Sequence, residues 1–471
     1  MHKHPTISQA LVPILITSCL LLLAATYLNT SLHIPLLIGT ISAVVVALSL
    51  GYHFSEVQEM MVRGVSSILP VIFIFILVGA LMGVWIASGT VPAMVYYGLR
   101  IITPTTYLPL TFVLCAAVSM SIGTAFGTTS TVGIATLGIG QALGLPLPLV
   151  VGAIVSGVYF GDRLSPLGSA LNLAAAVSET EVYDLMHHLF ATTIMPFVVS
   201  LGAYIYLGSR VRGALPVDQT SRFLTGIAAN FQLSPWLLLP PAIVILLAAL
   251  RVPAIPSLTA GAILGAIVAK VAQSASWASI FTVMHTGFKS SSADPVLQQL
   301  LSRGGISGMM DVISLLIIAL AFSGILEGTG MLDALLSGVL MKLRSIPQLI
   351  TGTVVVGTLV AMVAANQSLP IIVMGRSFIG CYKELKLHPK NLGRALLDSA
   401  GILCPLIPWN ISGLFMASML GVPVIKYAPF AFFCWLMPLG TLALAWLGYG
   451  RLKPIPRRGF HHKRIATSHQ H

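Results

Sequence analysis

Apolar segments long enough to cross a lipid bilayer recur from one end of this 471-residue chain to the other. A helix of roughly 20 apolar residues spans a bilayer core of about 30 Å. Only 8% of the residues are charged, against roughly 25% in a soluble domain, and the mean hydropathy is +0.94. The sequence therefore predicts an all-α polytopic membrane protein and argues against an enzyme with a large water-soluble domain.

The apolar runs fall into six in each half of the chain, so we expect about 10 to 12 transmembrane helices. The runs cover residues 11–28, 33–51, 65–88, 106–123, 147–160, 187–207, 235–250, 256–272, 308–327, 349–363, 393–411 and 424–448.

The longest polar stretch between these runs, residues 208–234, divides the chain into two membrane repeats, residues 1–207 and 235–450. Residues 451–471 follow the last run and hold six of the 25 Lys and Arg residues. Because cytoplasmic segments carry an excess of Lys and Arg, we expect the linker and this basic tail in the cytoplasm. Membrane topology thus accounts for the net charge of +12 without a nucleic-acid partner.

Two similarities at nearly one offset indicate that the halves arose by duplication. The segment RGVSSILPVIFIFILVGALMG from Arg63 resembles RGGISGMMDVISLLIIALAFSG from Arg303, about 240 residues later, and SPLGSALN from Ser165 aligns with CPLIPWN from Cys404. Many secondary transporters consist of such repeats, with the solute site where the halves meet near the bilayer midplane.

The relative orientation of the halves stays open from charge alone. Residues 375–394 carry five Lys and Arg whereas the equivalent residues 137–155 carry none, which favours halves inserted in opposite senses. The basic linker and the basic tail follow the two halves equivalently, which favours the same sense.

Each half contains small-residue or proline-broken segments at predicted membrane depth. Residues 119–138 contain four Gly, five Thr and three Ser, and residues 364–375 and 397–413 contain Pro370, Pro405 and Pro408. Polar backbone freed by such breaks must be buried in protein or line a wet cavity. Small residues also let membrane helices pack closely, so packing and a cation path both remain open for these segments.

Acidic residues inside apolar segments are the stronger signal. Asp162 lies in the stretch GDRLSPLGSALNLA, and an acid at membrane depth costs on the order of 3 kcal/mol, so it usually faces an ion or proton pathway. The alternative is that Arg163 neutralises it at the membrane edge. For Asp398 a functional and a structural role are likewise both open, and Asp311 and Glu327 in the run 308–327 are further candidates.

Other chemistry is not indicated. The chain has no HExxH motif and no Walker A sequence, and its five cysteines lack CxxC spacing, which argues against a metalloenzyme, an ATP-driven pump and a disulfide framework. We expect no cofactor beyond transported ions.

Several long segments identify the family. GTTSTVGIATLGIGQALGLPLPLVVGAIVSGVYFGDRLSPL at residues 127–167, LLSRGGISGMM at 300–310, HPKNLGRALLDSAG at 388–401 and PLIPWN at 405–410 resemble the NhaC family of Na⁺/H⁺ antiporters. The similarity covers nearly the whole chain. It implies a multi-pass secondary transporter of the bacterial inner membrane, with inverted repeats, re-entrant or broken helices, and Na⁺ and H⁺ as substrates.

Two departures from the family pattern bear on the substrate. Where the family has a motif like GDKMSPLSDTTNLA, this chain has Ser169 in place of the second acid and Ala170 and Leu171 in place of two threonines. Asn366-Gln367 stands where many members have Asp-Gln. Fewer fixed negative charges should hold Na⁺ less strongly. Either the transport stoichiometry differs, or neutral oxygens bind the cation, or the substrate is an organic solute.

From the residues and the resemblance together we predict a set of site residues, with Na⁺ at Asp162 and Asp398. Interhelical hydrogen bonding accounts equally well for the neutral ones. The cation- or proton-binding residues are Asp162, Ser165, Asn172, Asp398 and Asn410; the pathway residues are Thr124, Thr128, Thr129, Ser130, Asn366, Gln367, Ser368 and Asp311.

Three functional hypotheses follow. The first is Na⁺/H⁺ antiport in which Asp162, together with Asp398, alternates between protonated and cation-bound states. The second is exchange of small organic acids of the malate or lactate type, coupled to Na⁺ or H⁺. The third is a membrane scaffold or sensor that transports nothing. The lipid bilayer is the expected partner, and the sequence leaves homodimer formation open.

Overall fold

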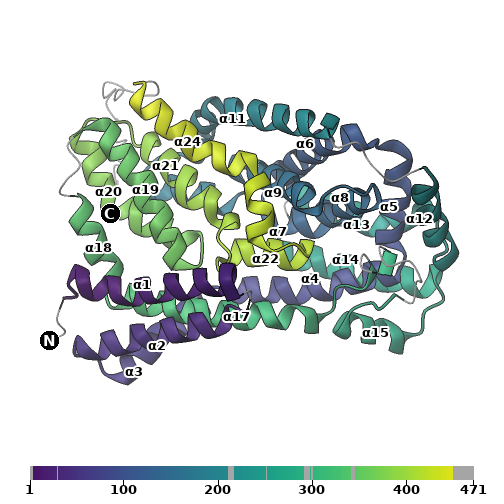
Figure 1. Cartoon of the computed structure of the whole chain (residues 1–471), viewed down its shortest axis with the longest axis horizontal. Coiled ribbons are helices and arrows are strands. Elements are labelled where there is room, and N and C mark those ends of the chain that lie inside the picture. Colours follow the sequence, from purple (N-terminus) through teal and green to yellow (C-terminus); the bar gives the residue numbers. More distant parts are fainter. Residues whose placement is uncertain are drawn as a thin grey trace, which may run out of the picture.

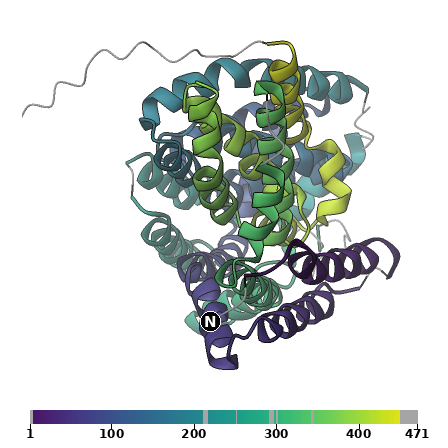
Figure 2. The same ribbon diagram turned by 90° about the vertical axis from the view of Figure 1, so that its left-hand side faces the viewer.

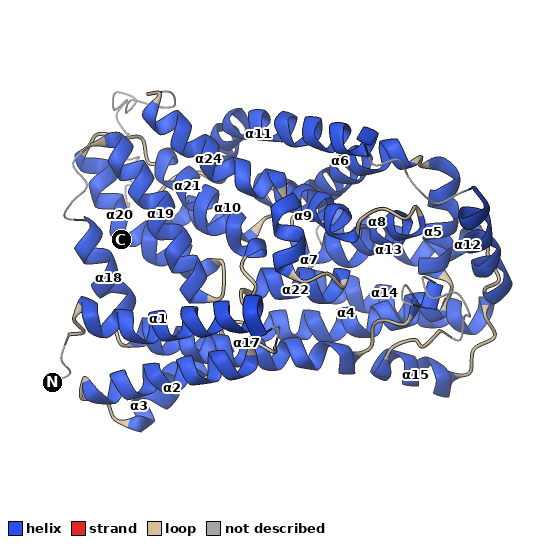
Figure 3. Cartoon of the chain, in the orientation of Figure 1, coloured by secondary structure: helices blue, strands red, loops and turns tan. Residues whose placement is uncertain are grey.

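A computed structural model describes residues 4–28, 30–210, 217–250, 252–290, 297–298, 301–340 and 345–448. Within these ranges the chain is helical and contains no strand, as Figure 3 shows, so the expected all-α class is confirmed. The basic tail, residues 451–471, and Arg212 of the linker lie outside the described residues.

The helices of the first half alternate between long spans and short segments. They are α1 Ile7–Leu23, α2 His33–Ser49, α3 Phe54–Ser66, α4 Leu69–Ala87, α5 Thr90–Ile101, α6 Pro104–Ile122, α7 Ala125–Thr128, the π-helical turn η2 Thr129–Gly133, α8 Ile134–Ala142, α9 Leu147–Leu164, α10 Ser169–Val177 and α11 Val182–Arg210.

The second half repeats this order after a helix in the linker. Its elements are α12 Val217–Asn230, α13 Leu239–Ala249, α14 Ala254–Ala272, α15 Trp277–Thr286, α17 Ile306–Gly328, α18 Met331–Leu340, α19 Ile346–Ala364, α20 Ser368–Glu384, α21 Lys390–Leu396, the π-helical turn η4 Leu397–Gly401, the short turn η5 Cys404–Leu406, α22 Ile411–Leu420, α23 Val424–Tyr427 and α24 Phe432–Trp446.

Seven helical segments in the described part are long and apolar enough to cross a membrane, and the number rises to 10 when each of three sharply bent helix pairs counts as one span. The count of 10 equals the lower end of the 10 to 12 transmembrane helices expected from the sequence. The chain is therefore a multi-pass membrane protein.

The helices form two layers (Figures 1 and 2). One layer, here called the framework, consists of α1–α4, α14, α15 and α17; the other, called the core layer, consists of α6–α11, α19–α22 and α24. Helices α5 and α12 lie at one end of the molecule and α18 at the other (Figure 1). Each layer draws helices from both halves of the chain, so the halves are interleaved.

Helix α17 runs antiparallel to α3 and α4. Its first turn is fixed to the middle of α4 by a 2.7 Å hydrogen bond from the Gly305 backbone N–H to the Gly79 carbonyl oxygen. Near its far end, Gly324 lies against Gly64 of α3, where neither residue has a side chain to hold the backbones apart. Because the segments beginning at Arg63 and Arg303 are equivalent in sequence, this is the arrangement of inverted repeats.

The breaks in the core layer also recur at one offset. Helices α6 and α19 both end in a left-handed residue, Gly123 with φ 76° and Ala365 with φ 54°. A second pair of breaks follows at residues 165–168 and 407–410. Subtracting 123 from 365, or 165 from 407, gives the same offset of 242, close to that expected from the sequence.

The first of these later breaks begins after Asp162. Helix α9 continues through Asp162 to Leu164, beyond the apolar run predicted to end at residue 160. It ends there because Pro166 disfavours a helical conformation in the residue before it, and Ser165 is extended with ψ 126°. Asp162 is thus held on a rigid helix rather than on a loop.

Candidate functional site

Asp162 lies in the last turn of α9 and faces the start of another helix. Its Oδ1 accepts a 3.2 Å hydrogen bond from the backbone N–H of Ala125, the first residue of the continuous helical stretch α7–η2–α8. The first N–H groups of a helix lack intrahelical partners and carry a partial positive charge, which stabilises a carboxylate. Asp162 has no cationic partner in the described part of the chain and is 8% exposed.

Asp398 lies in the π-helical turn η4 and is held by protein groups on both oxygens. Its Oδ1 is 2.5 Å from Nη2 of Arg163, and its Oδ2 accepts a hydrogen bond from the Thr441 hydroxyl. Asp398 is fully buried and Arg163 is 3% exposed. This ion pair joins α9 of the first half to η4 of the second, so Arg163 neutralises Asp398 and not its chain neighbour Asp162.

Arg394, one turn before Asp398, is a second fully buried cation. It interacts electrostatically with both Arg163 and Asp398, yet its three guanidinium nitrogens have no hydrogen-bond partner among the described residues. One carboxylate therefore serves two buried guanidinium groups, and removing its charge would leave both cations uncompensated.

The predicted hydroxyl residues of α7 and η2 bond within their own helix. Thr128, Thr129 and Ser130 each donate to the carbonyl oxygen four residues earlier, at 3.0, 2.9 and 2.7 Å. Such bonds are common for hydroxyls inside membrane helices. In this arrangement these three side chains support the helix, and they retain lone pairs that could accept from a proton donor or bind a cation.

The residues predicted at the breaks stabilise the turns. Asn172 donates to the carbonyl oxygens of Pro166 and Gly168, and the Ser165 hydroxyl accepts from the backbone N–H of Leu167. In the second half, Asn410 caps α22 by accepting from the backbone N–H of Ser412 at 3.0 Å. These side chains hold the shape of the two breaks rather than converging on Asp162.

Asp311 is separate from the other candidates. Its side chain is 84% exposed on α17, and the imidazole of His33 of α2 lies beside it, with Nε2 3.8 Å from Oδ1. The remaining candidates, Thr124, Asn366, Gln367 and Ser368, line cavities between the two layers.

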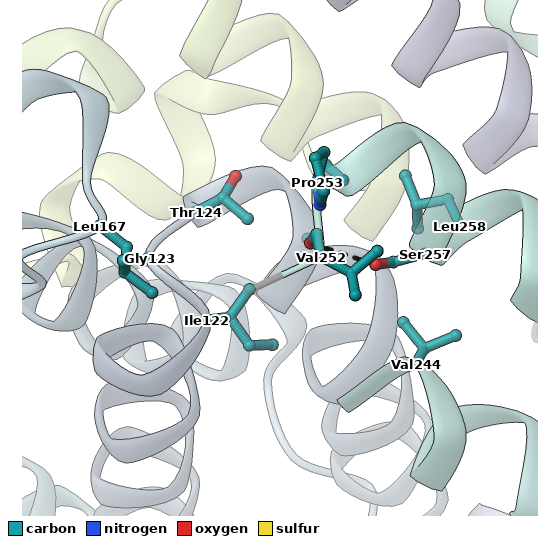
Figure 4. Close-up of a pocket in the computed structure, with 11 residues that line it drawn as sticks. Ile122, Gly123, Thr124, Leu167, Val244, Val252, Pro253, Ser257 and Leu258 are labelled. Atoms are coloured by element: carbon teal, nitrogen blue, oxygen red, sulfur yellow. Dashed lines mark hydrogen bonds between the residues drawn. The ribbon is translucent and has the colours of Figure 1, made fainter. Parts of the chain in front are cut away.

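One such cavity, of about 280 Å³, lies beside the first break (Figure 4). Thr124, Gly123 and Leu167 of the core layer face Val252, Pro253 and Ser257 at the start of α14 across it. Its lining is largely apolar. We call it the α14 cavity.

On the other side of α7 lie two adjoining cavities of about 310 and 330 Å³ that share Ser67, Glu327, Asn366 and Leu369; we call them together the vestibule. Phe126 and Ser412 also line it. Both positions where the chain lacks an acid of the family pattern, Ser169 and Asn366, line this same space. The carboxylates that the chain lacks relative to the family would therefore have faced one cavity together.

Sequence reasoning gave no role to Arg394, Thr441 or Phe126. The four-residue spacing between Arg394 and Asp398 was a usable signal for a charge pair on one helix face. Nothing in the sequence links Asp398 to Arg163 or Thr441, because these residues come together only in the folded chain, through the Arg163–Asp398 ion pair and the Thr441–Asp398 hydrogen bond.

Comparison with known proteins gives one family. The profile of the Na⁺/H⁺ antiporter family matches residues 1–157 and 157–449. The Na⁺/H⁺ antiporter NhaC of Alkalihalophilus pseudofirmus is 36% identical over 451 residues, which cover 96% of this chain and 97% of that protein.

Relatives that are named for other substrates are nearly as similar to this chain. The malate-2H⁺/Na⁺-lactate antiporter of Bacillus subtilis is 33% identical over 91% of this chain and 92% of its own length. The arginine/ornithine antiporter ArcD of Halobacterium salinarum is 33% identical over 95% of this chain and 93% of its own length. All three relatives are transporters rather than enzymes, and the fold, the breaks and the sequence similarity agree: the chain belongs to the Na⁺/H⁺ antiporter family.

Proposed function

We propose that the protein is a secondary Na⁺/H⁺ antiporter in which Asp162 carries either a proton or a Na⁺ ion. The observation that carries this assignment is that Asp162 alone combines burial, an electropositive helix start and the absence of a cationic partner in the described chain. A carboxylate without a fixed counter-ion can exchange one bound cation for another. Competition between H⁺ and Na⁺ for it couples the two fluxes.

Asp398 has a different role in this proposal. Its charge is matched by Arg163 at 2.5 Å and its second oxygen is occupied by Thr441. Binding Na⁺ there would require breaking a buried ion pair, which leaves an uncompensated guanidinium at a cost of about 3–5 kcal/mol. We therefore assign Asp398 to joining the two repeats and not to holding the transported cation.

The position of the cavities supports alternating access. Thr124 and Gly127 face the α14 cavity, whereas Phe126 faces the vestibule, so the helix start that binds Asp162 lies between two spaces. Both spaces lie between the core layer and the framework. Movement of one layer against the other would open Asp162 to one space at a time, as in other transporters built from inverted repeats.

The test is Na⁺-induced pH change in everted vesicles from an antiporter-deficient strain, measured over roughly pH 6.5 to 9. We expect a response with the wild type and its loss with Asp162→Asn, which keeps the shape of the side chain and its bond to Ala125. The absence of a wild-type response at every pH would refute the proposal.

A second candidate function is exchange of small organic acids. Ser169 and Asn366 make the vestibule less negative than two carboxylates would, which lowers the repulsion of an anion. The malate-2H⁺/Na⁺-lactate relative supports this candidate. Uptake of radiolabelled malate or lactate into proteoliposomes that lack a Na⁺-driven pH response would favour it over the first.

The proposal includes the location and the ligands. We place the protein in the bacterial inner membrane with the tail, residues 451–471, in the cytoplasm, because six Lys and Arg follow the last span closely. The transported ions are the only small ligands it requires.

A further inference from the structure

Glu327 lies at the junction of the two cavities that make up the vestibule. It lines both, and it is the one carboxylate among their described lining residues. Its side chain is exposed to this space and forms no hydrogen bond or ion pair with the described residues. A carboxylate that faces a cavity without a partner is available to a cation.

Oxygen atoms of neighbouring side chains lie around the same space. Ser323, one turn before Glu327 on α17, is 2% exposed and its hydroxyl has no partner, although it lines the vestibule. The Ser67 hydroxyl donates to the Gly64 carbonyl and keeps its lone pairs free. One carboxylate with neutral hydroxyl and amide oxygens is the ligand type that hard cations prefer.

The charges near this group favour a cation on balance. Arg63 lines the vestibule but is paired with Glu59 at 3.2 Å. Arg376 of α20 and Asp333 of α18 both interact electrostatically with Glu327 and oppose each other. The five charged groups together carry one net negative charge, contributed by Glu327.

The vestibule reaches the residue next to the one that binds Asp162. Phe126, which lines it, follows Ala125, whose N–H binds Asp162. Phe126 packs on Phe415 with ring centroids 4.6 Å apart, and Phe415 packs on Phe75 of the framework at 4.9 Å. These three rings therefore join α7, α22 and α4 beside the N–H group that binds Asp162.

We propose that the vestibule is the route by which Na⁺ reaches Asp162, and that Glu327 with Ser323 and Ser67 forms a separate site that binds the cation at its mouth. This inference rests on the proposed antiport function. In this proposal Glu327 on α17 of the framework first binds the Na⁺ ion, and Asp162 on α9 of the core layer exchanges it for a proton.

The experiment compares Glu327→Gln with wild type in proteoliposomes of the full chain, with Na⁺ concentration as the variable. We expect the apparent KM for Na⁺ to rise five- to tenfold, the effect of losing one charge contact at about 4 Å in a wet site. The maximal rate should stay within about twofold, because Asp162 is untouched. Glu384→Gln, an exposed acid of α20 that lines neither cavity, is the matched control and should keep the wild-type KM.

A second arm separates binding from long-range attraction. In about 0.5 M choline chloride, where charges beyond a few ångströms are screened, the KM difference should persist if Glu327 contacts the ion, and its disappearance would overturn the site. An unchanged KM in Glu327→Gln, with an active wild type, refutes this inference alone. No Na⁺-driven pH change in the wild type refutes the antiport proposal instead.

Discussion

The ion pair between Arg163 and Asp398 provides a direct test of whether Asp398 has a structural role while Asp162 binds the transported cation. Asp398→Asn removes the charge and keeps the volume, so Arg163 and Arg394 remain as two buried cations without a carboxylate. Breaking a buried pair by removing one partner costs about 3–5 kcal/mol. With an unfolding entropy of roughly 2.1 cal/mol/K per residue, the 471 residues give roughly 1 kcal/mol/K, so Tm should fall by about 3–5 °C.

The assay is thermal unfolding of purified protein in detergent, followed by the fluorescence of the six tryptophans, first without Na⁺. Asp162→Asn is the matched control, because Asp162 has no cationic partner and its replacement leaves no charge unpaired. We expect its Tm to stay within about 1 °C of wild type. The double variant Arg163→Met/Asp398→Leu should recover at least half of the loss, since apolar residues can replace a buried pair at little cost.

Adding Na⁺ separates structure from binding. A ligand that binds only the native state raises Tm, so Na⁺ should raise the Tm of wild type and Asp398→Asn by the same amount and that of Asp162→Asn, which keeps only the Glu327 site, by less. If Asp398→Asn instead keeps the wild-type Tm without Na⁺ and loses stabilisation by Na⁺, then Asp398 is a cation ligand and the reasoning from the ion pair is wrong.

Three further changes probe the vestibule and the surface. Phe126→Ala removes one ring of the Phe126–Phe415–Phe75 cluster and should speed the decay of a pH gradient in proteoliposomes without Na⁺; an unchanged decay would show that this cluster does not limit the leak. Ser169→Asp adds a carboxylate to the vestibule and should lower the apparent KM for Na⁺ severalfold, while a higher KM would contradict a cation route. The Lys390 ammonium, 2.9 Å from the Asp184 carboxylate, holds the pKa of Asp184 below its usual 3.8. This ion pair therefore stabilises the folded protein above pH 3.8, and the stabilisation is lost as the pH falls through the pKa of the folded state. Asp184→Asn should therefore lower Tm slightly at pH 7, and by progressively less as the pH falls below 3.8; a decrease in Tm that is the same at every pH would contradict it.

The parts of the fold that depend on local sequence could be predicted. The lengths of the apolar runs predict the membrane spans. Pro166 and Pro408 lie in the breaks at residues 165–168 and 407–410, because a proline disfavours a helical conformation in the residue before it. The duplication was visible as two similarities near one offset. The antiparallel course of α17 against α3 and α4 was not visible, because the charge counts in the loops conflicted. Only the Gly79–Gly305 and Gly64–Gly324 contacts, taken together, give the direction.

The sequence singled out two acids, Asp162 and Asp398, but not the residues that contact them. Asp162 and Asp398 stood out because a carboxylate at membrane depth is costly anywhere. Which acid Arg163 neutralises depends on rotation about α9: successive residues on a helix point about 100° apart, so Arg163 and Asp162 face different neighbours. No local pattern encodes that choice, since Arg163 and Asp398 come together only when the two halves pack.

The buried charges also constrain the exchange ratio. With Asp162 ionised, the buried set of Asp162, Arg163, Arg394 and Asp398 is neutral, and either one H⁺ or one Na⁺ at Asp162 gives it the same net charge of +1. Exchange at Asp162 alone is therefore electroneutral and insensitive to membrane potential. A ratio of two H⁺ to one Na⁺ needs a second carboxylate that can be protonated on the route, and Glu327 is the one carboxylate that lines the vestibule in the described chain. Antiport that responds to an imposed potential in wild type but not in Glu327→Gln would place the second proton there, whereas a response that survives the substitution would exclude Glu327 from the coupling.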